Sequence, residues 1–253
     1  MRLSAPVFRR MATTASAAKK KFPESALFPW PAVPSALVDI GANLADEAFA
    51  GDVEDVLARA RAAGVSRIVI TGTSVARSAA ALELAERHGC WSTAGVHPHD
   101  AKSWDGSTEA ALRALLAHPR CVAVGECGLD FNRNFSTRAE QEAALLRQLV
   151  LAADLRKPLF VHCRDAHQRL VELLKGHVFS CPVVVHCFTG NLDEALELLA
   201  LSPLVYIGFT GWLCDSREGR DVSLAQVVHA VPIERLLLEC VVPCRVGLCH
   251  FLL

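Results

Sequence analysis

Eight short apolar runs, separated by segments with helical periodicity, constrain the fold of this chain more than any other feature. The runs lie at 37–40, 67–70, 91–96, 121–125, 158–162, 182–187, 204–208 and 235–239. Short runs that are apolar on both faces are typical of parallel strands buried between other elements. Eight strands that alternate with helices predict an α/β protein with a (β/α)8 TIM barrel. A doubly wound open sheet is the alternative.

The segments between the runs carry the signals of helices. Two of them place apolar residues on one helical face: Val53, Val56, Leu57 and Ala60 in the first, and Leu145, Leu146, Leu149, Val150 and Ala153 in the second. Thr137 and Asn191 each precede a glutamate by three residues, which is the spacing of a capping box at the start of a helix. Seven helices between eight strands predict a barrel that lacks only its last helix.

The first 36 residues differ in composition from the rest of the chain. They carry six basic residues and one acidic residue among Ser, Thr and Ala, which is typical both of an organelle transit peptide and of a disordered tail. The barrel is expected over 37–239 and an atypical hydrophobic tail over 240–253. No run approaches the roughly 20 apolar residues of a spanning helix, so we expect no membrane span. An intracellular protein is expected, cytoplasmic or, with a transit peptide, mitochondrial or otherwise organellar.

Charge and cysteine usage limit the partners of the chain. The net charge is −1, and because the first 36 residues contribute +5, the remainder carries −6. An acidic body argues against a broad duplex-binding surface, which would need a basic stripe, so any contact with nucleic acid should be local. The ten cysteines form no CxxC pair, which favours reduced thiols. Irregular spacing and apolar surroundings disfavour a zinc cluster of Cys240, Cys244, Cys249 and His250.

Potential metal ligands stand at the ends of three apolar runs. Glu126, His162 and His186 follow VAVG, PLFV and PVVV. Because the carboxyl ends of barrel strands meet at one rim, we expect these side chains to converge. Mixed carboxylate and imidazole ligands hold a divalent cation, which lowers the pKa of a bound water and offsets charge on phosphoryl oxygens. The alternative is that each is a buried residue whose hydrogen bonds go to neighbouring backbone.

Two arginines expected on the same rim are candidates for phosphate binding. Arg133 follows the fourth run and Arg164 follows the fifth. A guanidinium binds phosphate through two parallel hydrogen bonds, which makes both residues suitable for a nucleic-acid substrate. The structural alternative is a salt bridge, with Asp130 or Asp165 as the partner.

Other residues near the ends of the runs are candidates for contact with a substrate. His97 can contact a phosphate or donate a proton, with a hydrogen bond that shapes its loop as an equal alternative, and that second role is favoured for His99. Asn43 can bond to a substrate or to a metal-bound water. Asp39 is either a ligand, a supporting carboxylate or a partner of loop amides. Trp212 can stack on a base, which suits a single strand, or anchor its loop.

With these residues placed, the chain resembles the TatD family of metal-dependent deoxyribonucleases, within the amidohydrolase-like barrels. The matching segments are DIGANL (39–44), GVHPHDA (95–101), GECGLDFNRNFST (125–137), HCRDAH (162–167), HCFTG (186–190) and YIGFTGWLCD (206–215). The resemblance implies hydrolysis of phosphodiester bonds from the 3′ end of single-stranded DNA. It also implies a catalytic Glu126 shared between metal positions, with His162 and His186 on one metal. Magnesium is the expected ion, and manganese and zinc are alternatives.

The chain departs from the family pattern after Glu239. There the family continues with a threonine, a metal-binding aspartate and Ala-Pro, whereas Val241 stands in this chain at the place of the aspartate. We therefore expect an impaired deoxyribonuclease. The alternatives are an isoform or truncated product that binds metal or nucleic acid without turnover, and a different hydrolase acting on esters or amides. On the first strand, Gly41 and Asn43 replace the His-x-His pair of many relatives, which implies fewer tightly held ions.

Overall fold

Eight parallel strands form one sheet in the computed structural model, which describes residues 36–214 and 220–240. The strands are β1 (Leu37–Ala42), β2 (Val65–Ile70), β3 (Trp91–Ala94), β4 (Cys121–Asp130), β5 (Leu159–Arg164), β6 (Val183–Val185), β7 (Val205–Phe209) and β8 (Leu236–Leu238). They are ordered in the sheet as they are in the sequence, and each pairs in parallel with the next. All eight predicted strands are present.

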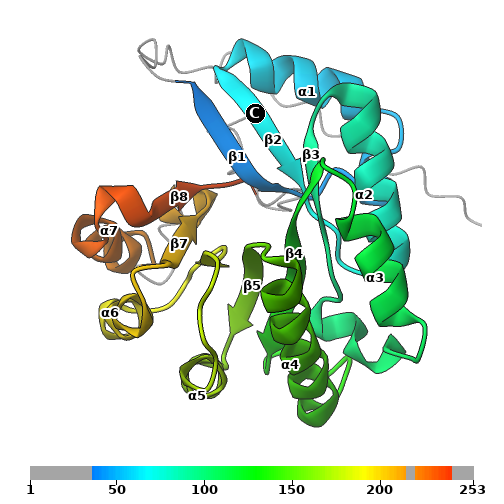
Figure 1. Cartoon of the computed structure of the whole chain (residues 1–253). Helices are drawn as coiled ribbons and strands as arrows, with labels where there is room; N and C mark the ends of the chain where they lie inside the picture. The colour runs from blue at the N-terminus through cyan, green and yellow to red at the C-terminus, as the bar shows by residue number, and fades with distance from the viewer. Residues whose placement is uncertain (1–35, 215–219, 241–253) are drawn as a thin grey trace, which may run out of the picture. The chain divides into compact units, whose positions relative to one another are not determined.

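Helices connect the strands and lie outside the sheet (Figure 1). They are α1 (Val53–Ala62), α2 (Val75–His88), α3 (Thr108–Leu116), α4 (Arg138–Leu155), α5 (His167–Lys175), α6 (Leu192–Leu201) and α7 (Arg220–Ala230). Fully buried leucines on α3 to α6, among them Leu112, Leu145, Leu170 and Leu198, belong to one core cluster with the strands. Burial of each such side chain contributes about 1.5–3 kcal/mol. The predicted TIM barrel is confirmed in place of the open sheet.

The barrel is nearly closed, and a side chain links its first and last strands. The Asp39 carboxylate on β1 accepts a hydrogen bond from the Cys240 amide just after β8, at 3.1 Å, and one from the Gly41 amide at 3.0 Å. Asp39 is buried, so these bonds offset part of the cost of removing its charge from water. Among the roles considered for Asp39, the structure shows that of a partner of backbone amides, one within β1 and one just after β8.

The buried face of α4 differs from the predicted apolar face. Leu146 and Val150 are 45% and 58% exposed, whereas Leu145 is buried. The prediction that these three residues share one buried face was therefore wrong for Leu146 and Val150. Two glutamines, Gln141 and Gln148, are buried there instead. A buried amide is stable where both its polar atoms are bonded, and these two bond to backbone groups of the loops at the carboxyl rim. Polar side chains thus occupy part of the inner face because they hold those loops.

Two further predictions concern helix starts and chain ends. Both capping boxes are present: Thr137 and Glu140 bond reciprocally before α4, and Asn191 and Glu194 do so before α6.

The predicted transit or disordered segment and the tail with its absent eighth helix fall almost wholly outside the described residues. Those described belong to one compact unit of the chain. Among their helices, none combines the length and apolar character needed to cross a bilayer.

Candidate active site

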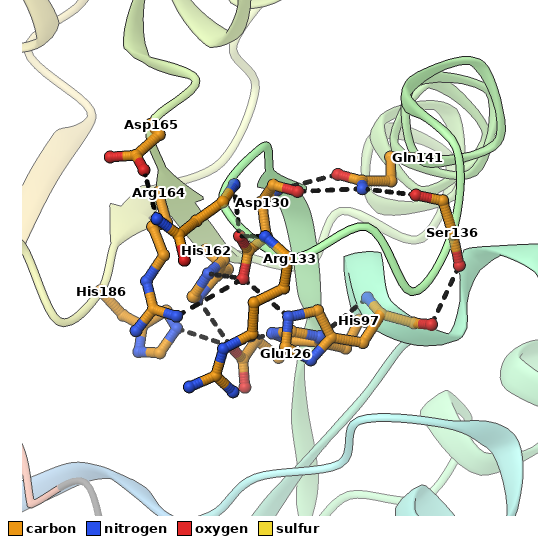
Figure 2. A network of polar contacts seen from close by, with 12 residues as sticks. His97, Glu126, Asp130, Arg133, Ser136, Gln141, His162, Arg164, Asp165 and His186 are labelled. Carbon is orange, nitrogen blue, oxygen red and sulfur yellow. Dashed lines mark hydrogen bonds and ion pairs between the residues drawn. The ribbon is translucent and has the colours of Figure 1, made fainter.

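Three histidines surround one carboxylate oxygen at the carboxyl rim of the barrel (Figure 2). Oε1 of Glu126 lies 2.8 Å from Nε2 of His186, 3.1 Å from Nε2 of His97 and 3.2 Å from Nδ1 of His162. The structure therefore brings together the three residues predicted as metal ligands. It also brings His97 into the same group: His97, Glu126 and His162 each offer a ligand atom, and these three atoms lie within 4.8 Å of one another.

The positions of these residues on their strands refine the prediction. β4 continues past Glu126 as far as Asp130, so Glu126 lies within the strand and not at its end. His162 is likewise within β5, whereas His186 directly follows β6. The longer β4 carries a second carboxylate to the rim, which the apolar run at 121–125 does not reveal.

Two buried carboxylates stand behind the histidines, and sequence reasoning did not assign them to the site. Asp130 Oδ2 lies 3.6 Å from Nε2 of His162, and Glu239 Oε2 lies 3.0 Å from Nδ1 of His186. Glu239 lies within hydrogen-bond distance and holds a proton on Nδ1 of His186, so that Nε2 is the nitrogen available to a cation. Asp130 lies just beyond that distance from His162, and its Oδ2 is bonded to His99 at 2.7 Å. The signal was available, because both acids end apolar runs, CGLD and RLLLE.

Glu239 fits its place because two neighbouring strands carry glycine there. A Cβ on Gly41 of β1 would lie 2.6 Å from Glu239 Oε2, and one on Gly208 of β7 would lie 2.5 Å from Oε1. The carboxylate also accepts a hydrogen bond from the Cys187 amide. Glu239 is fully buried and committed to these partners, so it supports His186 and is not free to replace an aspartate at position 241.

The hydrogen bonds of His97 distinguish it from the other two histidines. Its Nδ1 accepts a hydrogen bond from the His99 amide at 3.1 Å. In the neutral ring the proton is then assigned to Nε2, which faces Glu126. A ring whose proton points at the carboxylate is suited to donate that proton, whereas His186 would offer Nε2 to a cation once that nitrogen has given up its proton. His99 itself bonds to Asp130 at 2.7 Å, which is the loop-shaping role expected for it.

The two glutamines of α4 hold the loops that carry these side chains. Gln148 bonds to both backbone polar groups of Val96, at 2.8 and 3.0 Å, directly before His97. Gln141 accepts from the Asp130 amide at 2.8 Å and donates to the Asp130 and Ser136 carbonyls. Satisfied buried networks of this kind keep a site rigid.

Burial and neighbouring charges shift the pKa of each of Glu126, His162 and His186 in opposite directions, and the charges have the larger effect. Burial raises the pKa of Glu126, but His186 and His97 outweigh it and hold that pKa well below its usual range. Burial lowers the pKa of His186, yet the facing carboxylates of Glu126 and Glu239 raise it to about 10. Burial also lowers the pKa of His162, and the neighbouring carboxylates of Asp130 and Glu126 outweigh it, so that the pKa is raised. The site is thus built to hold positive charge.

A pH dependence of stability follows for the metal-free protein. Because the folded-state pKa of His186 is raised from 6.5 to about 10, its contribution to the unfolding free energy is complete below pH 6.5 and lost as pH rises towards 10. We expect the loss to reach up to about 1.4 kcal/mol per pH unit. Thermal unfolding of the chelated protein from pH 6 to 10 measures it. The His186→Asn variant is the control, because it keeps the buried cysteines, which also titrate at high pH, and lacks only the imidazole. If stability falls with pH as steeply in this variant as in the wild type, the expectation is contradicted.

A cavity of about 360 Å³ opens over the cluster and contains the predicted substrate-binding residues. Its lining includes Asn43, Arg133, Arg164 and Trp212 together with the histidines and carboxylates of the site. Arg164 lies 3.8 Å from Asp130, so the salt-bridge alternative describes part of its environment. The Arg133 amide donates to Asp130 at 3.0 Å, while its side chain is exposed. All four candidates therefore lie at one cavity.

The residues present fit a divalent cation. Glu126, His162 and His186 offer one oxygen and two nitrogens, a donor set used for such ions. Within the described part of the chain, the buried Oδ1 of Asn43 lacks a hydrogen-bond partner, although it lines the same cavity. A bound water or ion would satisfy this oxygen. A barrel with such a cluster at its carboxyl rim defines the class of metal-dependent hydrolases of the amidohydrolase-like type.

Comparison with known proteins identifies the family within that class. Residues 38–243 match the family described as TatD related DNase, and the chain belongs to that family. It is 52% identical to the 3′-5′ ssDNA/RNA exonuclease TatD of Klebsiella pneumoniae strain 342 over 205 residues, which cover 80% of this chain and 76% of that protein. It is 50% identical to the exonuclease of the same name from Escherichia coli K12, with coverage of 80% and 77%.

Solved structures agree with this assignment. A TatD homologue from Escherichia coli K12 superposes with a TM-score of 0.74 at 30% identity, over 81% of this chain and 78% of the homologue. A TatD family hydrolase from Entamoeba histolytica gives a TM-score of 0.71 at 29% identity, over 81% and 73%. The predicted family and fold are confirmed. The family match begins at residue 38, so it lends no support to a transit peptide.

Proposed function

We propose that this chain is a divalent-metal-dependent deoxyribonuclease that removes nucleotides from the 3′ end of single-stranded DNA. The observation that carries the proposal is the pair of carboxylate-backed histidines on Glu126: Asp130 faces His162, and Glu239 faces His186. The names of the 3′-5′ ssDNA/RNA exonucleases that are 50% and 52% identical to it over 205 residues support the direction and the substrate. An acidic body and a local site suit a single strand better than a duplex.

The side chains divide the work as follows. Glu126, His162 and His186 would hold the cation, with magnesium proposed and manganese or zinc as alternatives, and the bound ion would supply charge for the phosphoryl oxygens and acidify water. Arg133 and Arg164 orient the phosphate. His97 donates the proton at Nε2 to the leaving oxygen, because its Nδ1 is held by the His99 amide.

The remaining two residues act on the nucleotide and not on the phosphate. Asn43 offers its unbonded buried oxygen to a substrate hydroxyl or to water in the cavity. Trp212 lines the opening and provides an aromatic surface on which an unpaired base can stack. Release of nucleotides from a 3′-labelled and a 5′-labelled oligonucleotide, with and without magnesium, tests the polarity and the metal dependence together. Cleavage that survives chelation would contradict the proposal.

The role proposed for Arg164 leads to a separable prediction. Arg164→Ala should weaken the binding of a single-stranded oligonucleotide about tenfold or more, because a charged hydrogen bond to phosphate is lost, while metal affinity stays within about twofold. Titration at fixed salt measures the first quantity and calorimetry with magnesium the second. Arg113→Ala is a matched control, because that arginine is paired with Glu109 and Asp154 and lines neither the catalytic cavity nor the neighbouring cavity on the rim. Unchanged oligonucleotide affinity in Arg164→Ala would leave Arg164 with a structural role only.

The second candidate function is binding of metal or nucleic acid without turnover. It is favoured by one observation: Glu239 is already bonded to His186 and to the Cys187 amide. Glu239, two residues before Val241, is therefore not available to take the part of the aspartate that the family places where this chain has Val241. Val241 lies outside the described residues. We propose that catalysis by this chain is impaired for this reason, while the metal and the strand still bind.

A further inference from the structure

A second cavity opens on the same rim, beyond Arg164, and the proposed reaction leaves it unused. It measures about 460 Å³, within the roughly 300–1,000 Å³ typical of small-molecule sites. Residues that follow β4, β5 and β6 line it, and Arg164 is the one side chain that lines both this cavity and the catalytic cavity among those described. The two cavities are therefore adjacent at that guanidinium.

The floor of the second cavity is apolar. Ala166, Phe188 and Leu198 are buried there, and the ring of Phe131 stands at the side. The Arg138 guanidinium lies 4.3 Å from the centroid of the Phe131 ring and covers one of its faces. A planar, weakly polar group can be buried against such a surface with little loss of hydration.

The charged groups around the second cavity already have partners. Arg169 pairs with Glu142 and Glu172, at 2.7 and 2.8 Å. His167 bonds to Glu197 at 3.0 Å, and Glu194 accepts from the Asn191 amide in its capping box. Asp165 accepts from the Asn132 side chain at 2.7 Å. The cavity thus offers no cluster of free cations for a phosphate.

Uncharged polar groups remain at the edge of the second cavity. Gln168 and Thr189 are exposed there, on the loops or helix starts after β5 and β6, and the Gln168 amide nitrogen already donates to Glu197 at 3.4 Å. Amide and hydroxyl groups can donate to and accept from the edge of a heterocycle. An apolar floor with a neutral hydrogen-bonding edge matches a nucleobase, which has apolar faces and polar edges, and does not match the charged backbone.

We propose that the second cavity binds the base of a nucleotide adjacent to the scissile phosphate. The proposal rests on the proposed function, because Arg164 is taken to hold that phosphate in the catalytic cavity. A base attached through one sugar to a phosphate at Arg164 lies within one nucleotide of the guanidinium, and the second cavity begins there. Binding of the base in this cavity would hold the end of the strand through apolar contacts and neutral hydrogen bonds, without ion pairs.

Filling the second cavity tests the proposal by binding alone, so that slow catalysis does not obscure the result. Thr189→Trp places an indole at the edge of the cavity from an exposed position, which the fold should tolerate. Gln168→Trp does the same from the α5 side. Val178→Trp is the matched control, because Val178 is 85% exposed and lines neither cavity. Circular dichroism and thermal melts verify that each variant is folded.

The probes are a phosphorothioate DNA trinucleotide and three versions of it, in each of which one base is removed to leave an abasic site. Their dissociation constants are measured by calorimetry with magnesium at fixed salt. For wild type and Val178→Trp, removal of one of these bases should weaken binding about tenfold, the effect of a stacked base. Thr189→Trp should bind the intact trinucleotide about tenfold more weakly than wild type and lose less than twofold on base removal.

The outcomes distinguish failure of the base site from failure of the proposed nuclease function. If wild type binds the trinucleotide and base removal weakens wild type, Thr189→Trp and Gln168→Trp equally, the second cavity is not the base site, and the proposed nuclease stands. Equal affinity of wild type and both tryptophan variants for the intact trinucleotide would overturn it in the same way. If wild type binds no trinucleotide, the proposed function fails, and the base site fails with it.

Discussion

Replacing His162 by alanine should remove most of the bound divalent metal while leaving the barrel folded. Loss of a residue that merely orients a ligand costs about 10–100-fold in metal affinity, so loss of a ligand itself should cost at least about 100-fold. The fold should survive because His162 faces the catalytic cavity, whereas buried apolar residues such as Val161 pack the barrel. Elemental analysis of purified protein and a thermal melt of the same sample measure both quantities.

A matched control for this variant is His118→Ala. His118 pairs with a carboxylate too, that of Glu86 at 3.1 Å, but it lines neither cavity. Its variant should bind metal as the wild type does. If His162→Ala binds as much metal per protein as the wild type, His162 is not a ligand. If that variant does not fold, the measurement is repeated with His162→Asn, which keeps a polar side chain of similar size.

The second large effect concerns the residues after Glu239. We expect the chain to cleave single-stranded DNA at least about 100-fold more slowly than a chimera in which a family-type segment replaces everything after Glu239, because a positioned acid or base typically contributes about 10²–10⁴-fold. The chimera should also melt at a higher temperature. Val241→Asp alone should recover little, because a catalytic carboxylate needs a supporting loop to hold it in place.

These three proteins are compared in one assay, with magnesium and equal amounts of folded protein. Oligonucleotide affinity measured on the same samples separates binding from turnover. Equal affinity with unequal rates would favour impaired catalysis at an intact site. Full activity of the unmodified chain would overturn the idea that it is impaired, and it would mean that Glu239 or another acid takes the part of the missing aspartate.

Much of the barrel could be predicted from local patterns. Eight apolar runs located all eight strands, and Thr137 and Asn191 marked the starts of α4 and α6. The boundary of β4 was less predictable, because Gly125, Glu126 and Gly128 interrupt the apolar pattern although the strand continues to Asp130. The pairing with β5 is irregular between Val124 and Cys127 and then resumes from Cys127 to Asp130, so the strand extends past the interruption.

The sequence by itself determined the alternation of strands and helices, the rim on which Glu126, His162 and His186 lie, and the family, because burial periodicity and the order of motifs are properties of the chain read in one direction. Only the tertiary structure decided which groups pair. His186 and Glu239 are 53 residues apart, and Glu126 and His186 are 60 apart, so closure of the barrel brings them together. It likewise decided that Gln141 and Gln148 face inward, because the backbone groups that satisfy them belong to loops after other strands.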